Sequence, residues 1–118
     1  MRALVVVAHG SRRAASNDEV RKLTDQLRPQ ASEFDLVSCA FLELAEPSIP
    51  EGIEAAIADG ADEVVVLPYF LSAGRHVAED IPGFVEQSRQ QHPGVCIRIA
   101  PYLGTASDLP NTLLNLVK

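Results

Sequence analysis

The sequence predicts a three-layer α/β/α fold around a four-stranded parallel sheet. Four short apolar segments, rich in β-branched residues, alternate with four helical patterns along the chain. The apolar segments are continuous rather than alternating, which is typical of strands that are buried on both faces. The resulting βαβαβαβα order favours parallel strands, right-handed crossovers and helices on both faces of the sheet. A chain of this length has room for one core, so residues 1–118 are expected to form a single domain.

The expected strands cover residues 4–8, 36–42, 63–67 and 95–100. The first helix is expected to start at Ser16, because Ser16 and Glu19 have the spacing of a capping box. Ser48 and Glu51 repeat that pattern before the second helix, and Gly60 is suited to end it.

The third helix is expected to start at Asp80, with Pro82 in its first turn, and to end at His92-Pro93-Gly94. The last helix is expected to begin near Ser107 or Asp108. Its apolar residues recur at helical spacing, which predicts that they face the core: Leu109, Leu113, Leu116 and Val117.

Composition and charge exclude several classes of protein. Ten Lys and Arg residues against sixteen Asp and Glu give a net charge of −6, which argues against a nucleic-acid or membrane partner. No apolar run approaches the roughly 20 residues of a membrane span, and a cytoplasmic location is expected. Cys39 and Cys96 belong to no metal or redox spacing, so buried free thiols are expected.

Residues that can bind a metal ion or transfer a proton follow the first three predicted strands. In an open parallel sheet, ligands bind beyond the carboxyl ends of the strands. His9 and Arg12 follow the first strand, Glu43 and Glu46 follow the second, and the segment ending in Arg75-His76 follows the third. Two histidines, two carboxylates and several arginines are therefore expected to converge on one edge of the sheet.

This set of side chains suits a loosely held divalent metal. Histidine binds Co, Ni, Fe and Zn, and neutral imidazole is also a general base near neutral pH. Gly10 and Gly74 are expected to allow sharp backbone turns beside the two histidines. The sequence contains neither a G-x-x-x-x-G-K-[ST] nor a G-x-G-x-x-G pattern, so no ATP or dinucleotide is expected.

Structural explanations compete with the functional ones at each position. A single histidine after a strand is commonly a loop residue, and His92 is read as a solvated residue at a helix end. Glu46 could serve only the start of the following helix, Glu43 could be an exposed strand end, and Arg12 could be a solvated charge. The pairing of His9 and His76 on one edge favours a site.

Three segments resemble the small CbiX-type sirohydrochlorin chelatases, class II enzymes related to the anaerobic cobaltochelatases and the protoporphyrin ferrochelatases. The segments are residues 7–12 (VAHGSR), 41–52 (FLELAEPSIPEG) and 68–82 (PYFLSAGRHVAEDIP). The resemblance implies a chelatase-like half-domain that inserts Co²⁺, Fe²⁺ or Ni²⁺ into sirohydrochlorin without ATP, in cobalamin or sirohaem biosynthesis. It also implies a homodimer, because larger relatives hold two such halves in one chain.

The resemblance also implies roles for individual residues. His9 matches the histidine that binds metal and accepts pyrrole protons, and His76 matches a second metal ligand. Glu43 matches, more weakly, a third metal-handling carboxylate. The implied substrate contacts are Glu46, Leu71, Ser72, Ala73, Gly74, Arg75 and His76. Arg12 is expected to contact the substrate as well, because it adds local positive charge to a chain of net charge −6.

Two other functions use the same residues. A cobalt or nickel carrier could employ both histidines without a ring substrate. A phosphohistidine-type phosphoryl transferase also has a His-Gly pair after its first strand, but Ala8 stands where such an enzyme needs an arginine.

Overall fold

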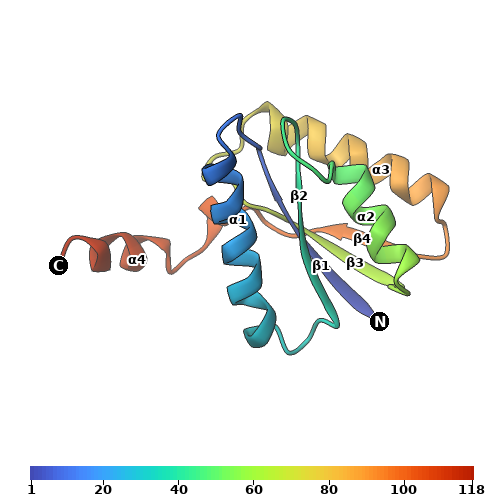
Figure 1. Ribbon diagram of the computed structural model, residues 1–118, viewed down its shortest axis with the longest axis horizontal. Helices are drawn as coiled ribbons and strands as arrows, with labels where there is room; N and C mark the ends of the chain where they lie inside the picture. The colour runs from blue at the N-terminus through green and yellow to red at the C-terminus, as the bar shows by residue number, and fades with distance from the viewer.

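The computed structural model describes all 118 residues and is built on four parallel strands in the order β2-β1-β3-β4 (Figure 1). The strands are β1 (Arg2–Ala8), β2 (Leu36–Phe41), β3 (Glu63–Pro68) and β4 (Cys96–Ile99). In the central register, Val7 pairs with Ala40 of β2 and with Pro68 of β3. The predicted parallel α/β fold is confirmed, with strand ends that differ from the expected ones by one or two residues. Because β1 and β3 are neighbours, their carboxyl ends lie side by side.

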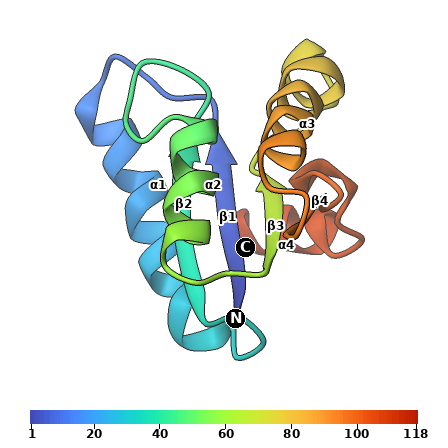
Figure 2. The ribbon, with the colours of Figure 1, turned by 90° about the vertical axis from the view of Figure 1, so that its right-hand side faces the viewer.

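Helices cover the two faces of the sheet unequally. Alternate residues of a strand point to opposite faces. Val5 and Val7 belong to a core of thirteen buried residues that includes residues of α2 (Ile49–Ala58) and α3 (Ile81–Gln91). Val6 belongs to a core of only four buried residues, which packs against the end of α1 (Ala14–Leu27). Figure 2 shows α1 on one side of the strands, with α2 and α3 on the other.

The predicted start of the second helix is confirmed, and that of the first is wrong. At α2, the Glu51 amide donates to Ser48 Oγ at 3.2 Å and the Ser48 amide donates to Glu51 Oε1 at 2.9 Å. These hydrogen bonds lower the pKa of Glu51. In contrast, α1 begins at Ala14, and the Ser16 amide already donates to the Arg13 carbonyl at 3.0 Å. Ser16 therefore lies inside the first turn and cannot cap it.

The third helix begins earlier than the sequence predicts. A π-helical turn, His76–Asp80, runs directly into α3. Asp80 therefore lies inside a helical segment rather than at its start, and this segment begins at His76. Ile81 and Val85 of α3 face the core, and both side chains are completely buried.

The prediction that the last helix packs on the core is wrong. Helix α4 (Leu109–Leu116) has no buried residue and extends away from the sheet at the C-terminal end (Figure 1). Leu113, Leu116 and Val117 are 55%, 76% and 80% exposed. The preceding 3₁₀ turn, Leu103–Thr105, is followed by extended backbone at Ala106, and this sequence of conformations directs α4 outward.

The two cysteines are free, as predicted, but they are not buried. Cys39 is half-buried, and Cys96 is exposed because β4 is a short strand at the edge of the sheet. None of the helices combines the length and the apolar character that a bilayer crossing requires.

Candidate active site

His9 and His76 lie against each other at the carboxyl edge of the sheet. Their ring centres are 5.0 Å apart, and the ring planes meet at 65°. His9 directly follows β1, while His76 opens the π-helical turn after the β3 loop. The predicted convergence of two histidines that are 67 positions apart in the chain is therefore confirmed (76 − 9 = 67).

The His9 ring is fixed by its own loop. Its Nδ1 atom lies 2.9 Å from the carbonyl oxygen of Gly10. Because a carbonyl oxygen only accepts hydrogen bonds, Nδ1 carries the proton and Nε2 of the neutral ring has a free lone pair. His9 as a whole is an exposed residue.

The His76 ring is oriented by a carboxylate. Its Nδ1 atom lies 2.7 Å from Oδ2 of Asp80, with side chains that are 40% and 37% exposed. Residues four apart on a helical turn share one face, which brings the two groups together. A hydrogen bond from Nδ1 to a carboxylate or carbonyl is the usual support for a metal-binding histidine, because it directs the Nε2 lone pair outward.

The β1 loop is locked against the loop after β2. The Glu43 amide donates to the His9 carbonyl at 3.1 Å, and Gly10 has a φ of +92°. A Cβ atom on Gly10 would overlap the Glu43 carbonyl oxygen. On the other side of the loop, Asn17 makes two hydrogen bonds to the backbone of Ser11, at 2.9 and 2.8 Å.

The two predicted carboxylates do not join the histidines. No group of three or more His, Cys, Asp or Glu side chains lies close enough to hold a metal ion. Glu43 meets the site through its backbone, and its side chain is exposed. Glu46 is exposed as well, and its carbonyl accepts a hydrogen bond from Arg21 at 3.0 Å. The histidine pair is thus the structural centre of the site.

The loop before His76 lies open to solvent. Residues 71–75 are all exposed, and Leu71 is 68% exposed. Arg75 is 80% exposed and its Nε atom lies 3.5 Å from Glu79 Oε2. Across the edge, Leu44 is 53% exposed on the loop after β2. Arg12 is exposed on the β1 loop. The edge therefore presents apolar and cationic side chains beside the two imidazoles.

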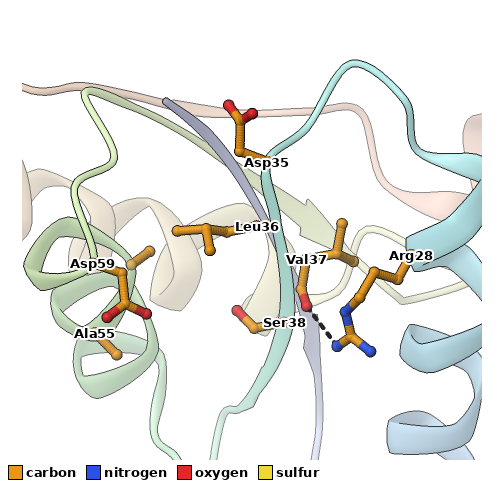
Figure 3. Close-up of a pocket in the computed structure, with 8 residues that line it drawn as sticks. Arg28, Asp35, Leu36, Val37, Ser38, Ala55 and Asp59 are labelled. Carbon is orange, nitrogen blue, oxygen red and sulfur yellow. Dashed lines mark hydrogen bonds between the residues drawn. The ribbon is translucent and has the colours of Figure 1, made fainter.

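None of the three hollows of the molecule is lined by His9 or His76, although one of them is lined by Asp80, so one copy of the chain leaves the pair uncovered. A hollow of about 310 Å³ lies beside β2, where Arg28 donates to the Val37 carbonyl at 2.8 Å (Figure 3). It includes residues from the start of β2 and the end of α2, at the opposite end of the strands. Its lining is Arg28, Asp35, Leu36, Val37, Ser38, Ala55, Ala56 and Asp59.

Sequence reasoning missed Asp80 and Asn17 as supports of the site. The spacing of His76 and Asp80 is a signal that could have identified the first, once residues 76–80 are recognised as helical. His92 lies at the C-terminal end of α3, as predicted, but it is half-buried rather than fully solvated. Its side chain is 24% exposed, and its Nε2 atom lies 2.7 Å from Glu54 Oε2, far from the pair in the fold.

The arrangement supports metal and proton chemistry. Metal–imidazole bonds are about 2.1 Å long. Two rings with centres 5.0 Å apart can therefore reach one ion when both Nε2 atoms turn toward it. Two protein ligands leave most coordination positions of a divalent ion free for water or for a second ligand. The same lone pairs can accept protons.

Known proteins are similar to this chain in sequence. The family model described as CbiX matches residues 3–118. A sirohydrochlorin cobaltochelatase of Methanocaldococcus jannaschii is 37% identical over 93 residues, covering 76% of this chain and 64% of the relative. A sirohydrochlorin cobaltochelatase of Sulfurisphaera tokodaii is 31% identical over 118 residues, covering all of this chain and 92% of the relative.

A solved structure has the same fold. The sirohydrochlorin chelatase SirB from Bacillus subtilis subspecies spizizenii, in complex with cobalt, superposes with a TM-score of 0.89 at 26% identity. The match covers 98% of this chain and 49% of SirB. The chain spans 57% to 64% of the length of three archaeal cobaltochelatases that it matches.

Proposed function

Because the chain belongs to the CbiX family, we propose that it is a sirohydrochlorin chelatase, which inserts a divalent metal ion into the ring without ATP. The observation that carries the proposal is the contact between His9 and His76, each with its Nδ1 atom engaged and its Nε2 atom free. The relatives are named as cobaltochelatases, and the SirB structure contains cobalt.

In the proposed reaction, the incoming ion exchanges water for ring nitrogens, and two pyrrole protons leave the macrocycle. His9 and His76 hold the ion through Nε2, with the remaining positions open to the ring. Once the ion moves into the ring, the freed lone pair of His9 accepts one pyrrole proton and passes it to water, and the second pyrrole proton leaves by the same route. General base catalysis of this kind contributes about 10²–10⁴-fold. Glu43 would assist only by moving its exposed carboxylate toward the ion.

The substrate would lie over the exposed loop of residues 71–76, with Glu46 at the border of the site. Sirohydrochlorin carries many carboxylates, and a body of net charge −6 repels them. Arg12 and Arg75 provide local positive charge beside the histidines. Exposed Leu44 and Leu71 offer apolar contacts to a flat macrocycle. Co²⁺, Fe²⁺ and Ni²⁺ all suit imidazole ligands.

The test is an anaerobic insertion assay. Protein, sirohydrochlorin and Co²⁺ are mixed, and the change in absorbance of the macrocycle is followed; Fe²⁺ and Ni²⁺ are then compared. We expect His9→Ala to lower the rate by about 10²–10⁴-fold, as for loss of a general base. His76→Ala is expected to weaken Co²⁺ binding as well. His92→Ala is the matched control, because His92 contacts Glu54 and not the pair.

The alternatives give different results. A metal carrier would bind Co²⁺ through the pair yet leave the spontaneous insertion rate unchanged. Equal rates in the wild type and in both site variants would refute the assignment, provided that circular dichroism shows all proteins folded. We further propose a cytoplasmic location and a homodimer, the second of which is testable by mass measurement in solution.

A further inference from the structure

The loop after β2 contains a leucine in a backbone conformation that leucine rarely adopts. Leu44 has a φ of +66°, and it is the one residue other than glycine with a positive φ. In this left-handed region the Cβ atom of an L-residue comes too close to the following carbonyl oxygen. Glycine or asparagine therefore normally occupies such a position, and a bulky side chain there is an outlier.

The fold gains no core packing from the Leu44 side chain. This side chain is 53% exposed, and it belongs to neither of the two apolar cores. Leu42, two positions earlier, does pack against the larger core. Asparagine at position 44 would relieve the backbone and would expose less apolar surface. An exposed leucine alone is ordinary, but one that is also held in an unfavourable conformation points to a role in binding.

Backbone hydrogen bonds fix the loop on the β1 side of Leu44. The Glu43 amide, directly before Leu44, donates to the His9 carbonyl at 3.1 Å. The loop is also closed at its base, where the Phe41 amide donates to the Pro47 carbonyl at 2.8 Å. Leu44 thus follows a residue that is bonded to the backbone of His9, and its backbone cannot relax without loss of these contacts.

Arg21 of α1 fixes the second half of the same loop. Its Nη2 atom donates to the Glu46 carbonyl at 3.0 Å, and its Nη1 atom donates to Asp18 Oδ1 at 2.9 Å. The guanidinium carbon also lies 5.1 Å from the centre of the Phe41 ring, within the range of a cation–π contact. Arg21 therefore connects α1, the end of β2 and the loop that carries Leu44.

Arg28 makes the same kinds of contact at the other end of β2. Its Nη1 atom donates to Asp25 Oδ1 at 2.9 Å, and its Nη2 atom donates to the Val37 carbonyl at 2.8 Å. The side chains of Arg21 and Arg28 are 43% and 53% exposed. The two arginines thus differ mainly in which end of the strand they hold, and only Arg21 lies at the end that carries the histidines.

We propose that Leu44 packs against the face of the tetrapyrrole and selects it from smaller polycarboxylates, and that Arg21 is the positioning residue that holds the loop for this contact. The proposal rests on the proposed chelatase function and specifies how the ring is recognised. The ring must lie over His9 to receive the ion, which brings its face to the neighbouring loop. Arginines attract any polycarboxylate, whereas an apolar contact with Leu44 is available only to a ligand with an apolar face. A loop that is already fixed loses little further freedom on binding.

The first experiment measures the Kd of metal-free sirohydrochlorin from the absorbance of the macrocycle. We expect Leu44→Ala to raise Kd about tenfold, as for loss of one apolar contact. Leu44→Met keeps the apolar bulk and should stay within about twofold of the wild type. Tricarballylate, a small tricarboxylate without a ring, should compete with unchanged affinity in Leu44→Ala. Equal ring affinity in the wild type and Leu44→Ala, or a wild type that does not bind the ring, would overturn the proposal.

The second experiment separates binding from stability by urea denaturation at one protein concentration. Leu44→Asn should raise the urea midpoint by about 0.5 M, because asparagine tolerates a positive φ, while Kd for the ring rises as in Leu44→Ala. Leu44→Ala keeps the unfavourable φ and should leave the midpoint nearly unchanged. A lower midpoint in Leu44→Asn would show that the leucine serves the fold, and would refute the proposed role.

The third experiment tests Arg21 as a positioning residue, with Arg28→Ala as the matched control. Both alanine variants lose similar contacts and should lower the urea midpoint by similar amounts. Only Arg21→Ala should raise Kd for the ring, by about threefold to tenfold. Because Arg21 acts through Leu44, its substitution in a Leu44→Ala background should add less than about twofold. Equal Kd values for the two arginine variants, or fully multiplicative effects, would overturn the positioning role.

The titrations contain no metal ion, so they do not depend on turnover. Ring binding that depends on Leu44 supports the contact even if the insertion assay fails, and that failure would count against the chelatase activity alone. Normal insertion together with ring affinity that is independent of Leu44 would refute the contact and leave the chelatase assignment in place.

Discussion

The loop after β1 and the loop after β3 each bring one histidine to the same edge, but they are built differently. The β1 loop is held on both sides: the Glu43 amide bonds to His9, and Asn17 bonds twice to Ser11. The β3 loop exposes all of residues 71–75, and its histidine is oriented from the helical turn that follows. One imidazole therefore sits on a fixed support, and the other depends mainly on Asp80.

This difference suggests that the two histidines have different roles toward a metal ion that must be bound and then released. A fixed His9 gives the ion and the proton a constant position. A histidine on an open loop can follow the ion as a large substrate arrives, since loops with few supporting contacts open at low cost in free energy. Substitutions in the β1 loop should therefore have larger effects than substitutions in the β3 loop.

Among substitutions that leave both histidines in place, Gly10→Ala should have the largest effect. Its φ of +92° is unfavourable for alanine, and the added Cβ atom would overlap the Glu43 carbonyl. We expect the free energy of unfolding to fall by about 2 kcal/mol or more. A displacement of His9 by about 1 Å would reduce kcat/KM about 10²-fold. Urea denaturation and the insertion assay measure the two effects, and an active, fully stable variant would contradict the fixed-support interpretation.

Gly10 and Gly74 also indicate what could be predicted from the sequence. The sequence predicts sharp turns at both, yet only Gly10 has a positive φ, and a Cβ atom added to Gly74 would meet no atom within 4 Å. Residue type alone could not separate them, because the requirement at Gly10 comes from Glu43, which is distant in sequence. The sheet and the histidine pair were predictable, because apolar periodicity and strand order depend on local pattern.

For helix α4, the sequence predicts the element but not its position in the fold. Its leucine spacing correctly predicts an amphipathic helix, but spacing does not specify which surface the helix covers. The contact between Asp80 and His76 was not predicted either. The third helix was expected to start at Asp80, which leaves His76 outside the helix. Local propensity therefore predicted the elements well, while tertiary contacts across the sheet edge determined the details of the site.

Asp80→Ala should have the next largest effect. Loss of the carboxylate frees the His76 ring to rotate and to change tautomer, and loss of such a support costs about 10–100-fold in metal affinity or activity. Asp80→Asn retains an oxygen acceptor and should keep more activity than the alanine variant. Glu79→Ala is the matched control, because Glu79 contacts Arg75 and not the imidazole. Co²⁺ titration and the pH profile of insertion distinguish orientation of His76 from a merely structural role.

Arg75→Ala should have a smaller effect, and mainly on KM. Its side chain is 80% exposed, and exposed charge pairs contribute little in water. We expect KM for sirohydrochlorin to rise about threefold to fivefold, as for loss of up to about 1 kcal/mol, with kcat nearly unchanged. Rates measured over a range of sirohydrochlorin concentrations provide both constants. A large fall in kcat at constant KM would instead place Arg75 in the chemical step.

Gly74→Ala should have the smallest effect of the set, and it completes the contrast with Gly10. An added methyl group at Gly74 meets open space, and the Gly74 carbonyl would still accept the Ala78 amide at 2.9 Å. Alanine reduces the freedom of the unfolded chain, which stabilises by about 0.4–1 kcal/mol, but it is less favourable than glycine at the start of a helix. The two contributions offset each other, so the urea midpoint should shift little and KM should change less than about twofold. If Gly74→Ala were as damaging as Gly10→Ala, the β3 loop would also require a fixed conformation, and the proposed division between a fixed and an adaptable histidine would be wrong.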